Sequence, residues 1–300
     1  MAWQDYVRVT SVEEALQQLD TFDGEGRIIA GGTDLILQLR SGEKKARCLI
    51  DISCVESLCH IREKEGRILI GACATHSEIS LSPIIAAKAP VLSEACSQVG
   101  SPQIRNIGTV GGNIVNAQPA ADSVIALMAL DAVCQIESSG DDKVRPINQL
   151  FLGPGVSDVD STREILTEIA FDALGPSEGS AFYRLARRKG ATLPTLNCAV
   201  CLSWNREKRR IERIRIAMGP VGPVPTRLYE TEKVLTSDTF SDSLMDEALM
   251  TAYREANPRS SLRSGKEYRQ EMTKVILRRA LLRALRSAGC ENGESQEKDH

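Results

Sequence analysis

The stretch that decides the fold reads Asn106-Ile107-Gly108-Thr109-Val110-Gly111-Gly112-Asn113-Ile114-Val115-Asn116, and a shorter one upstream, Ala30-Gly31-Gly32-Thr33-Asp34, shares its central feature. Each stretch sets a pair of glycines close to a threonine, and each interrupts an apolar segment. Because glycine reaches positive φ freely and has no Cβ, its main chain can press close to a ligand. The two stretches therefore predict two tight glycine-rich bends.

Such bends suit an anionic ligand. Successive backbone N–H groups exposed in a turn form a concavity that accepts phosphate oxygens, and two bends facing one another can hold one pyrophosphate from both sides. A glycine pair after a strand is also commonly just a tight turn. The recurrence of the motif with a threonine, and the polar residues Asn113, Asn116 and Asp122 that follow the second copy, favour the ligand site.

Length, composition and charge limit the classes of protein to which this chain can belong. A chain of 300 residues with 42% hydrophobic residues is long enough for two domains with real cores. A net charge of −3 and a pI near 5.8 argue against a nucleic-acid binder, which would be basic. The start of the sequence has no signal-peptide pattern, and no apolar run is long enough to span a bilayer. We therefore expect a cytoplasmic protein without a membrane span.

The cysteines and histidines give no metal or catalytic pattern. Nine cysteines are scattered among mostly apolar neighbours, where free thiols behave as small hydrophobes. Cys198 and Cys201 have CxxC spacing, but residues i and i+3 of a strand point to opposite faces, so these thiols are not expected to share a metal. His60 lies in a predicted hairpin and His76 in a helix-capping pattern, so we expect structural roles for both. No catalytic side chain and no metal ligand is predicted.

The spacing of hydrophobic residues and the helix-capping patterns predict an α+β fold. Short strands and short helices alternate without a regular βαβ rhythm, which disfavours a doubly wound sheet. Capping patterns at Ser11-Val12-Glu13-Glu14 and Thr75-His76-Ser77-Glu78 mark two helix starts. Strands are predicted at residues 27–30, 48–52, 67–71, 132–137, 164–171, 180–186, 195–204 and 210–218, and further helices at 90–99, 120–130, 244–255 and 266–285.

An ordered set of motifs carries a family resemblance. The set comprises residues 28–35 (IIAGGTDL), 100–114 (GSPQIRNIGTVGGNI), 119–122 (PAAD) and 180–188 (SAFYRLARR), with Tyr268-Arg269 and residues 276–280 near the end. In this order they resemble the FAD-binding subunit of molybdenum-containing hydroxylases, as found in bacterial xanthine dehydrogenases and in the medium subunit of carbon monoxide dehydrogenases. The resemblance covers nearly the whole chain.

The resemblance implies a PCMH-type FAD-binding domain, named after p-cresol methylhydroxylase, of two α+β subdomains over residues 1–176. A small α+β flavoprotein C-terminal domain over 177–287 follows, and the polar segment 288–300 is expected to be disordered. Extended FAD would have its pyrophosphate held by main-chain amides of both glycine motifs. The cofactor-binding residues implied are Ile28, Ile29, Ala30, Gly31, Gly32, Thr33, Asp34, Leu35, Thr109, Val110, Gly111, Gly112, Asn113, Asp122, Leu166 and Arg184.

The resemblance also implies a function. The chain would be the electron-transfer subunit of a xanthine dehydrogenase-like complex, whose partners are an iron–sulfur subunit and a molybdenum cofactor-binding subunit. Electrons from a hydroxylated purine or other N-heterocycle would pass through the iron–sulfur clusters to FAD, and from there to NAD⁺ or another acceptor such as O₂. Two alternatives stay open at this point. One is a self-contained FAD-dependent oxidoreductase acting directly on a small substrate, and the other is an assembly subunit that has lost its flavin.

Overall fold

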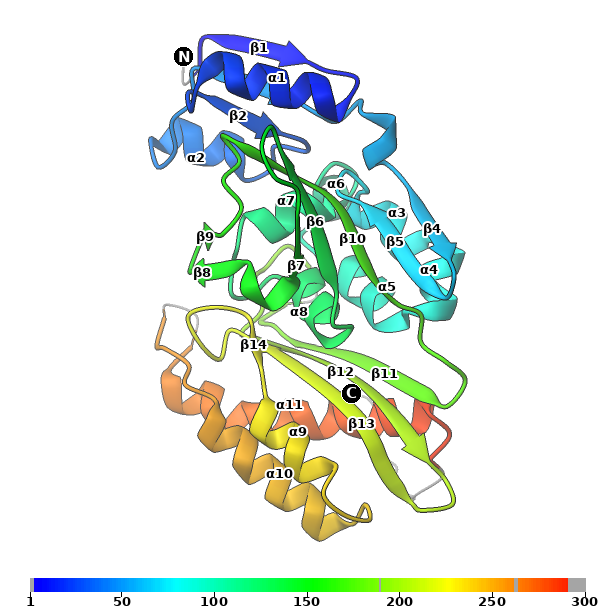
Figure 1. Ribbon diagram of the computed structural model, residues 1–300. Coiled ribbons are helices and arrows are strands. Elements are labelled where there is room, and N and C mark those ends of the chain that lie inside the picture. The colour runs from blue at the N-terminus through cyan, green and yellow to red at the C-terminus, as the bar shows by residue number, and fades with distance from the viewer. Residues whose placement is uncertain (1–2, 189, 262–263, 291–300) are drawn as a thin grey trace.

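The computed structural model describes residues 3–188, 190–261 and 264–290. Its layers follow the chain from the N-terminus to the C-terminus, each built on a sheet (Figure 1). The strands are β1 (Asp5–Arg8), β2 (Gly26–Ile29), β3 (Cys48–Asp51), β4 (Ile61–Lys64), β5 (Arg67–Gly71), β6 (Val133–Ser138), β7 (Lys143–Pro146), β8 (Phe151–Gly153), β9 (Val156–Ser157), β10 (Glu164–Asp172), β11 (Glu178–Leu185), β12 (Leu196–Asn205), β13 (Arg210–Gly219) and β14 (Thr226–Arg227). The helices are α1 (Val12–Phe22), α2 (Leu35–Ser41), α3 (His76–Leu81), α4 (Pro83–Lys88), α5 (Pro90–Ser97), α6 (Pro102–Arg105), α7 (Val110–Val115), α8 (Asp122–Ala129), α9 (Tyr229–Leu235), α10 (Asp242–Glu255) and α11 (Lys266–Ser287).

The first layer is a parallel sheet in the order β1-β3-β2, with α1 and α2. Helix α1 begins where its capping pattern predicts, because the Ser11 hydroxyl accepts the Glu14 amide at 3.1 Å. Strand β2 runs directly into the first glycine-rich stretch, where Gly32 has a φ of +68° that favours glycine. Helix α2 follows at once, so the first bend connects a strand to a helix.

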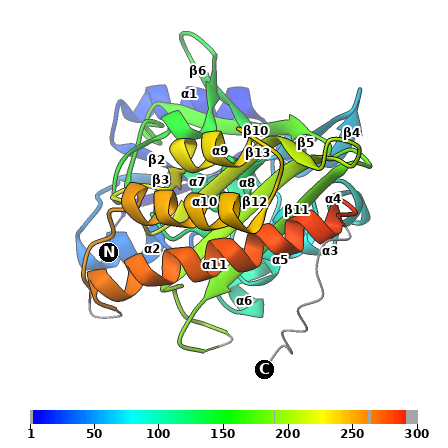
Figure 2. The same ribbon diagram turned by 90° about the horizontal axis from the view of Figure 1, so that it is seen from below.

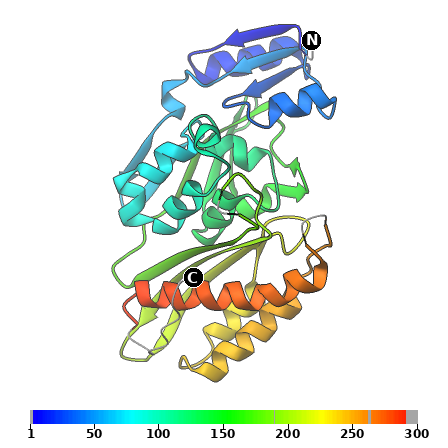
Figure 3. The ribbon, with the colours of Figure 1, turned by 180° about the vertical axis from the view of Figure 1, so that it is seen from behind.

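The middle layer is an antiparallel sheet in the order β4-β5-β10-β6-β7, and helices α3 to α8 lie beside it (Figures 1 and 3). Helix α3 starts with a complete capping box. The Thr75 hydroxyl accepts the Glu78 amide at 3.2 Å, and the Glu78 carboxylate accepts the Thr75 amide at 2.7 Å. The predicted helix 120–130 is α8, whose residues are buried along its whole length. This helix connects the middle layer to the last one.

The last layer is an antiparallel sheet in the order β11-β12-β13-β14, with α9, α10 and α11 covering one face (Figure 2). Helices α5 and α8 of the middle layer contact the other side of this sheet. Strand β12 confirms the expectation for the CxxC spacing, because Cys198 packs in the core under α10 and α11 whereas Cys201 packs in the core of the middle layer. The two thiols face opposite sides of the strand.

The second glycine-rich stretch departs from the expected bend. Residues Thr109 to Val115 form the N-cap and body of the short helix α7, and the Thr109 hydroxyl accepts the Gly112 amide at 3.1 Å. Gly111 is required by packing, because a Cβ there would lie 2.6 Å from the Cβ of Ala72. A strong N-cap and one close contact therefore produce a helical turn where the glycine pair suggests a loop.

The end of the chain is packed as far as it is described. Of the segment 288–300 that is expected to be disordered, residues 288–290 follow α11 directly, and Ala288 and Cys290 are buried in the last layer. Residues 291–300 lie outside the described part. Across the described ranges, no helix combines the length and apolar character needed to cross a membrane.

Candidate functional site

The two glycine-rich stretches lie in direct contact with one another. A Cβ on Gly31 would lie 1.9 Å from the carbonyl oxygen of Ile107 and 3.1 Å from the Cα of Gly108. Only glycine at position 31 allows the two main chains to approach this closely. The contact joins the first layer to the middle layer and forms the floor of a cleft.

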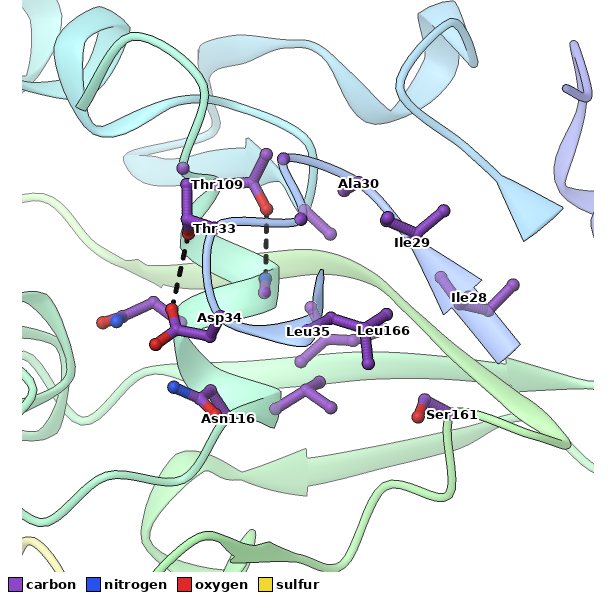
Figure 4. A pocket seen from close by; sticks show the side chains of 18 of the residues that line it. Ile28, Ile29, Ala30, Thr33, Asp34, Leu35, Thr109, Asn116, Ser161 and Leu166 are labelled. Atoms are coloured by element: carbon purple, nitrogen blue, oxygen red, sulfur yellow. Dashed lines mark hydrogen bonds between the residues drawn. The ribbon is translucent and has the colours of Figure 1, made fainter. Parts of the chain in front are cut away.

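The cleft has a volume of about 990 Å³ including its open mouth, and both stretches line it. Figure 4 shows Thr33, Asp34 and Leu35 of the first stretch facing Thr109 and Asn116 of the second, with Ile28 and Leu166 farther along. The lining includes these residues expected from the sequence: Ile28, Ile29, Ala30, Gly31, Gly32, Thr33, Asp34, Leu35, Thr109, Gly111, Gly112, Asn113 and Leu166.

Three residues expected at the site do not line this cleft. Val110 is fully buried in the core of the middle layer. Asp122 and Arg184 pair with each other instead, with Nε of Arg184 donating to Oδ2 of Asp122 at 3.1 Å. Asn197 donates to the other carboxylate oxygen at 2.7 Å. Burial raises the pKa of Asp122 to about 6, while Arg184 and Asn197 act in the opposite direction. This buried pair ties α8 to the last sheet.

Several lining residues were not expected. Asn116 belongs to the polar run after the second stretch, which was the available signal, and its Oδ1 accepts Nε2 of Gln38 at 3.1 Å. His76 was expected to be a surface or capping residue, yet it is only 2% exposed and lines the cleft. Ile104, Gly108 and Val115 belong to the second motif or the segment just before it, and the remaining unexpected residues come from segments without a motif: Lys44, Ile52, Ala72, Val99, Val159, Ser161, Glu164 and Ile165.

The main-chain amides of the two stretches differ in availability. In α7, the Gly111 amide donates to the Ala72 carbonyl at 2.9 Å, and the Asn113 amide donates to the Thr109 carbonyl at 3.0 Å. In the first stretch, the amides of residues 31–34 donate to no acceptor in the part of the chain that the structure describes. In the second stretch the Thr109 amide likewise donates to no acceptor among the described residues, whereas those of Val110 to Asn113 are all bonded, so most of the free donors belong to the first stretch.

The cleft fits a diphosphate flanked by rings. The unpaired amides of residues 31–34 suit phosphate oxygens. A Cβ on Gly112 would meet only the Thr109 hydroxyl within 4 Å, at 2.9 Å, so this glycine leaves the cleft open. Oδ1 of Asn113 accepts a hydrogen bond from the Ser123 hydroxyl at 2.7 Å, so the side-chain nitrogen of Asn113 remains as a further donor. Apolar walls at Ile28 and Leu166 suit an aromatic ring.

A cation lies at the Ile28 side of the cleft. The Lys44 ammonium forms no ion pair with any residue in the described ranges. Burial lowers its pKa, and the nearby Arg27 guanidinium lowers it further. Arg27 donates to Ser161 at 2.8 Å, so this wall holds two cations. The cleft therefore offers both hydrogen-bond donors and positive charge to an anionic ligand.

The chain is similar to known proteins over nearly its whole length. Residues 2–171 match the family model "FAD binding domain in molybdopterin dehydrogenase", and residues 181–284 match "CO dehydrogenase flavoprotein C-terminal domain". The alpha subunit of the 6-hydroxypseudooxynicotine dehydrogenase complex of Paenarthrobacter nicotinovorans is 31% identical, covering 95% of each chain. A putative xanthine dehydrogenase FAD-binding subunit of Escherichia coli is 28% identical over 95% of this chain and 97% of its own. A chain of carbon monoxide dehydrogenase from Hydrogenophaga pseudoflava superposes with a TM-score of 0.90 at 28% identity, covering 95% of this chain and 98% of that one.

Proposed function

The chain belongs to the family of FAD-binding domains in molybdopterin dehydrogenases, and we propose that it binds FAD in the cleft between its two glycine-rich stretches and passes electrons from a partner's iron–sulfur clusters to NAD⁺ or another acceptor. It is an FAD-binding oxidoreductase subunit. The proposal concerns where FAD lies, which residues hold it and where the electrons come from and go.

The observation that carries the proposal is the row of unpaired amides at residues 31–34 beside the open face of Gly112. The pyrophosphate would lie against those amides, with the side-chain nitrogen of Asn113 and the Thr109 hydroxyl on the other side. Val110 and Gly111 shape the floor without binding the cofactor directly. This arrangement assigns the phosphate-binding role chiefly to the first stretch.

The orientation of FAD follows from the position of the last layer. The loop after β11 reaches the cleft near Gly100, where the Ala191 amide donates to the Gly100 carbonyl at 3.0 Å. The Arg184 guanidinium, held by Asp122, donates to the Thr192 carbonyl in the same loop. The flavin ring would lie on this side, near Val99 and Ile104, and the adenosine would lie beside Ile28, Ser161 and Leu166. Arg184 and Asp122 position the loop over the flavin.

Bound FAD would supply a carrier that accepts and releases electrons. The side chains of this protein bind it, orient its ring toward the loop after β11 and exclude water from its diphosphate. Within the described residues no group of three or more His, Cys, Asp or Glu side chains is arranged to hold a metal. The proposed source of electrons is therefore a separate iron–sulfur subunit, supplied by a molybdenum cofactor-binding subunit.

The names of relatives support a substrate class for the complex. The relative from Paenarthrobacter is named for 6-hydroxypseudooxynicotine and the one from Escherichia for xanthine, and both compounds contain a nitrogen heterocycle. We place the substrate, a purine or a related N-heterocycle, on the molybdenum subunit. The FAD-binding domain would cover residues 1–176 and the C-terminal domain residues 177–287.

The test is to purify the tagged chain from its source with its partners attached. We expect flavin absorbance, one FAD per chain, and two companions that contain iron–sulfur clusters and molybdenum. Reduction of NAD⁺ and consumption of O₂ by this complex, each measured with xanthine as the substrate, identify the electron acceptor. A chain that turns over substrate without companions would support the self-contained oxidoreductase instead. A purified chain that neither contains nor takes up FAD would contradict the proposal.

A further inference from the structure

His76 is a buried histidine that none of the assigned roles explains. It is the first residue of α3, directly after the Thr75 cap, and its amide donates to the Gly108 carbonyl at 3.0 Å. The next residue, Ser77, donates to Asn106 at 2.6 Å. These bonds fix the start of α3 against the second glycine-rich stretch, so the position of the His76 side chain is set by its backbone.

One edge of the imidazole faces the place where the two stretches meet. A Cβ on Gly108 would lie 3.6 Å from Cδ2 of His76 and 3.7 Å from the hydroxyl oxygen of Thr33. Nδ1 is fully buried and has no hydrogen-bond partner. Nε2, which is bonded to Cδ2, also has no hydrogen bond to any described residue, but it is not fully buried. The ring therefore presents Nε2, and not Nδ1, to the cleft.

The protonation of the ring follows from its surroundings. Burial lowers the pKa of His76 to about 4, and the positive charge of Arg105 contributes in the same direction. The neutral ring carries one proton. A buried N–H without an acceptor is rarer and more costly than an acceptor without a donor, so the proton belongs on Nε2. His76 is thus a neutral donor over the whole physiological pH range.

We propose that the Nε2–H of His76 donates a hydrogen bond to an oxygen or nitrogen acceptor on the riboflavin-phosphate half of bound FAD. This inference rests on the proposed placement of FAD. Val99 and Ile104 line the same part of the cleft, and Gly100 between them is bonded to the loop of the last layer. The adenosine wall at Ile28 and Ser161 belongs to the first layer and to the segment before β10, on the other side of the stretches.

A pair of matched variants tests the bond. In His76→Gln the side-chain amide nitrogen can reach the position of Nε2, whereas in His76→Asn the shorter side chain reaches only the position of Nδ1. We expect His76→Asn to raise the Kd of the apo-protein for FAD about tenfold, the effect of one lost hydrogen bond. His76→Gln should stay within about threefold of wild type. The Kd for AMP, which lacks the riboflavin-phosphate half, should be unchanged in both.

Three other outcomes of these titrations would contradict the inference, and each has a different meaning. Equal FAD affinity in both variants and wild type would show that His76 does not bind FAD, and parallel weakening of AMP and FAD binding would show that His76 contacts the AMP half. If wild type itself does not bind FAD, the proposed function fails together with the inference. Should His76→Asn unfold, wild type labelled with ¹⁵N on histidine decides. The Nε2 proton should be present without FAD and become protected from exchange with FAD, and a ring protonated on Nδ1 contradicts the proposal.

Discussion

The adjacent glycines Gly111 and Gly112 of the second stretch have different structural roles. A Cβ on Gly111 would lie 2.6 Å from the Ala72 side chain and 2.7 Å from the Ala72 carbonyl oxygen, so this glycine permits the contact between α7 and the segment after β5. A Cβ on Gly112 would touch only the Thr109 hydroxyl, toward the cleft. The sequence pattern treats the two residues alike, whereas packing separates a structural glycine from one that keeps the ligand site open.

Substitution of Gly112 by valine should weaken FAD binding without unfolding the chain. The isopropyl group would occupy the cleft beside the proposed pyrophosphate, and we expect the Kd for FAD to rise by about a hundredfold or more. Gly111→Val is the matched control. It should lower the free energy of unfolding by about 1–3 kcal/mol or more, because overpacking strains the contact with Ala72.

Fluorescence titration with FAD and urea denaturation of both variants measure the two effects. If Gly112→Val binds FAD with wild-type affinity, the pyrophosphate does not lie beside Gly112.

The buried pair of Asp122 and Arg184 gives a pH-dependent prediction. Their side chains are 6% and 4% exposed, and removing one member of a buried pair leaves an uncompensated charge. Arg184→Met should therefore destabilise the apo-protein by about 3–5 kcal/mol at pH 8.

The sign of the pH effect follows from Asp122. Burial already raises its pKa to about 6, and loss of Arg184 raises that pKa further. A carboxyl whose pKa is higher in the folded state takes up protons on folding, so its contribution favours folding at low pH and fades as pH rises through the folded pKa. The difference in unfolding free energy between Arg184→Met and wild type should thus shrink from pH 8 to pH 5. A difference that grows toward pH 5 in urea denaturation would contradict this assignment.

At the scale of elements, periodicity and capping predicted most of the helices and strands. The Thr75 capping box, strand β5 and the long α11 lie where these patterns indicate. The hairpin forms, but its first strand β4 is Ile61–Lys64, whereas residues 58–61 were expected. The patterns failed for α7, because a threonine cap and a contact with Ala72 outweigh the low helix propensity of two glycines. They also missed the cleft residues from distant segments, since Lys44 and Ser161 meet there only through the pairing of sheets.

Strand β12 provides a prediction about its cysteines. Cys198 is fully buried on one face and Cys201 on the other. Cys198→Ser should lower the free energy of unfolding by about 1–3 kcal/mol, because a buried hydroxyl replaces a thiol among apolar neighbours. Its iron and zinc content, measured by mass spectrometry, should equal that of wild type. Cys54→Ser, at an exposed position, is the control and should change stability by less than about 0.5 kcal/mol. Metal lost selectively from Cys198→Ser would show that the CxxC spacing binds metal.

At the scale of the whole molecule, the buried side chain of Arg227 and its hydrogen-bond partners join the last layer to the middle one. Arg227 of β14 contacts Glu232 of α9 through Nε at 2.7 Å and also bonds Asp131, which follows α8. A second link from Arg227 to the middle layer is its bond to the Met128 carbonyl at 3.2 Å. The layer that positions the flavin-side loop is thus held by charged groups as well as by its apolar core.

Removing Arg227 should affect stability far more than removing Asp131. Arg227→Met leaves the Glu232 carboxylate, 12% exposed, without its cation, whereas the Asp131 side chain is 56% exposed. We expect a loss of about 3–5 kcal/mol for Arg227→Met and of less than about 1 kcal/mol for Asp131→Asn. Urea denaturation of the two variants measures this, and equal losses would show that the exposed pair carries the connection.

The central claim is that the first glycine-rich stretch supplies most of the free amides that bind FAD, while the amides of Val110 to Asn113 in the second stretch are already used inside the protein. Hydrogen exchange of the purified chain, measured residue by residue by ¹H–¹⁵N NMR without and with FAD, tests this claim most directly. The account predicts that the amides of residues 31–34 exchange rapidly without FAD and become protected when FAD is added, and that those of Gly111 and Asn113 are protected in both states. Protection by FAD at Gly111 and Asn113 with no change at residues 31–34 would contradict it.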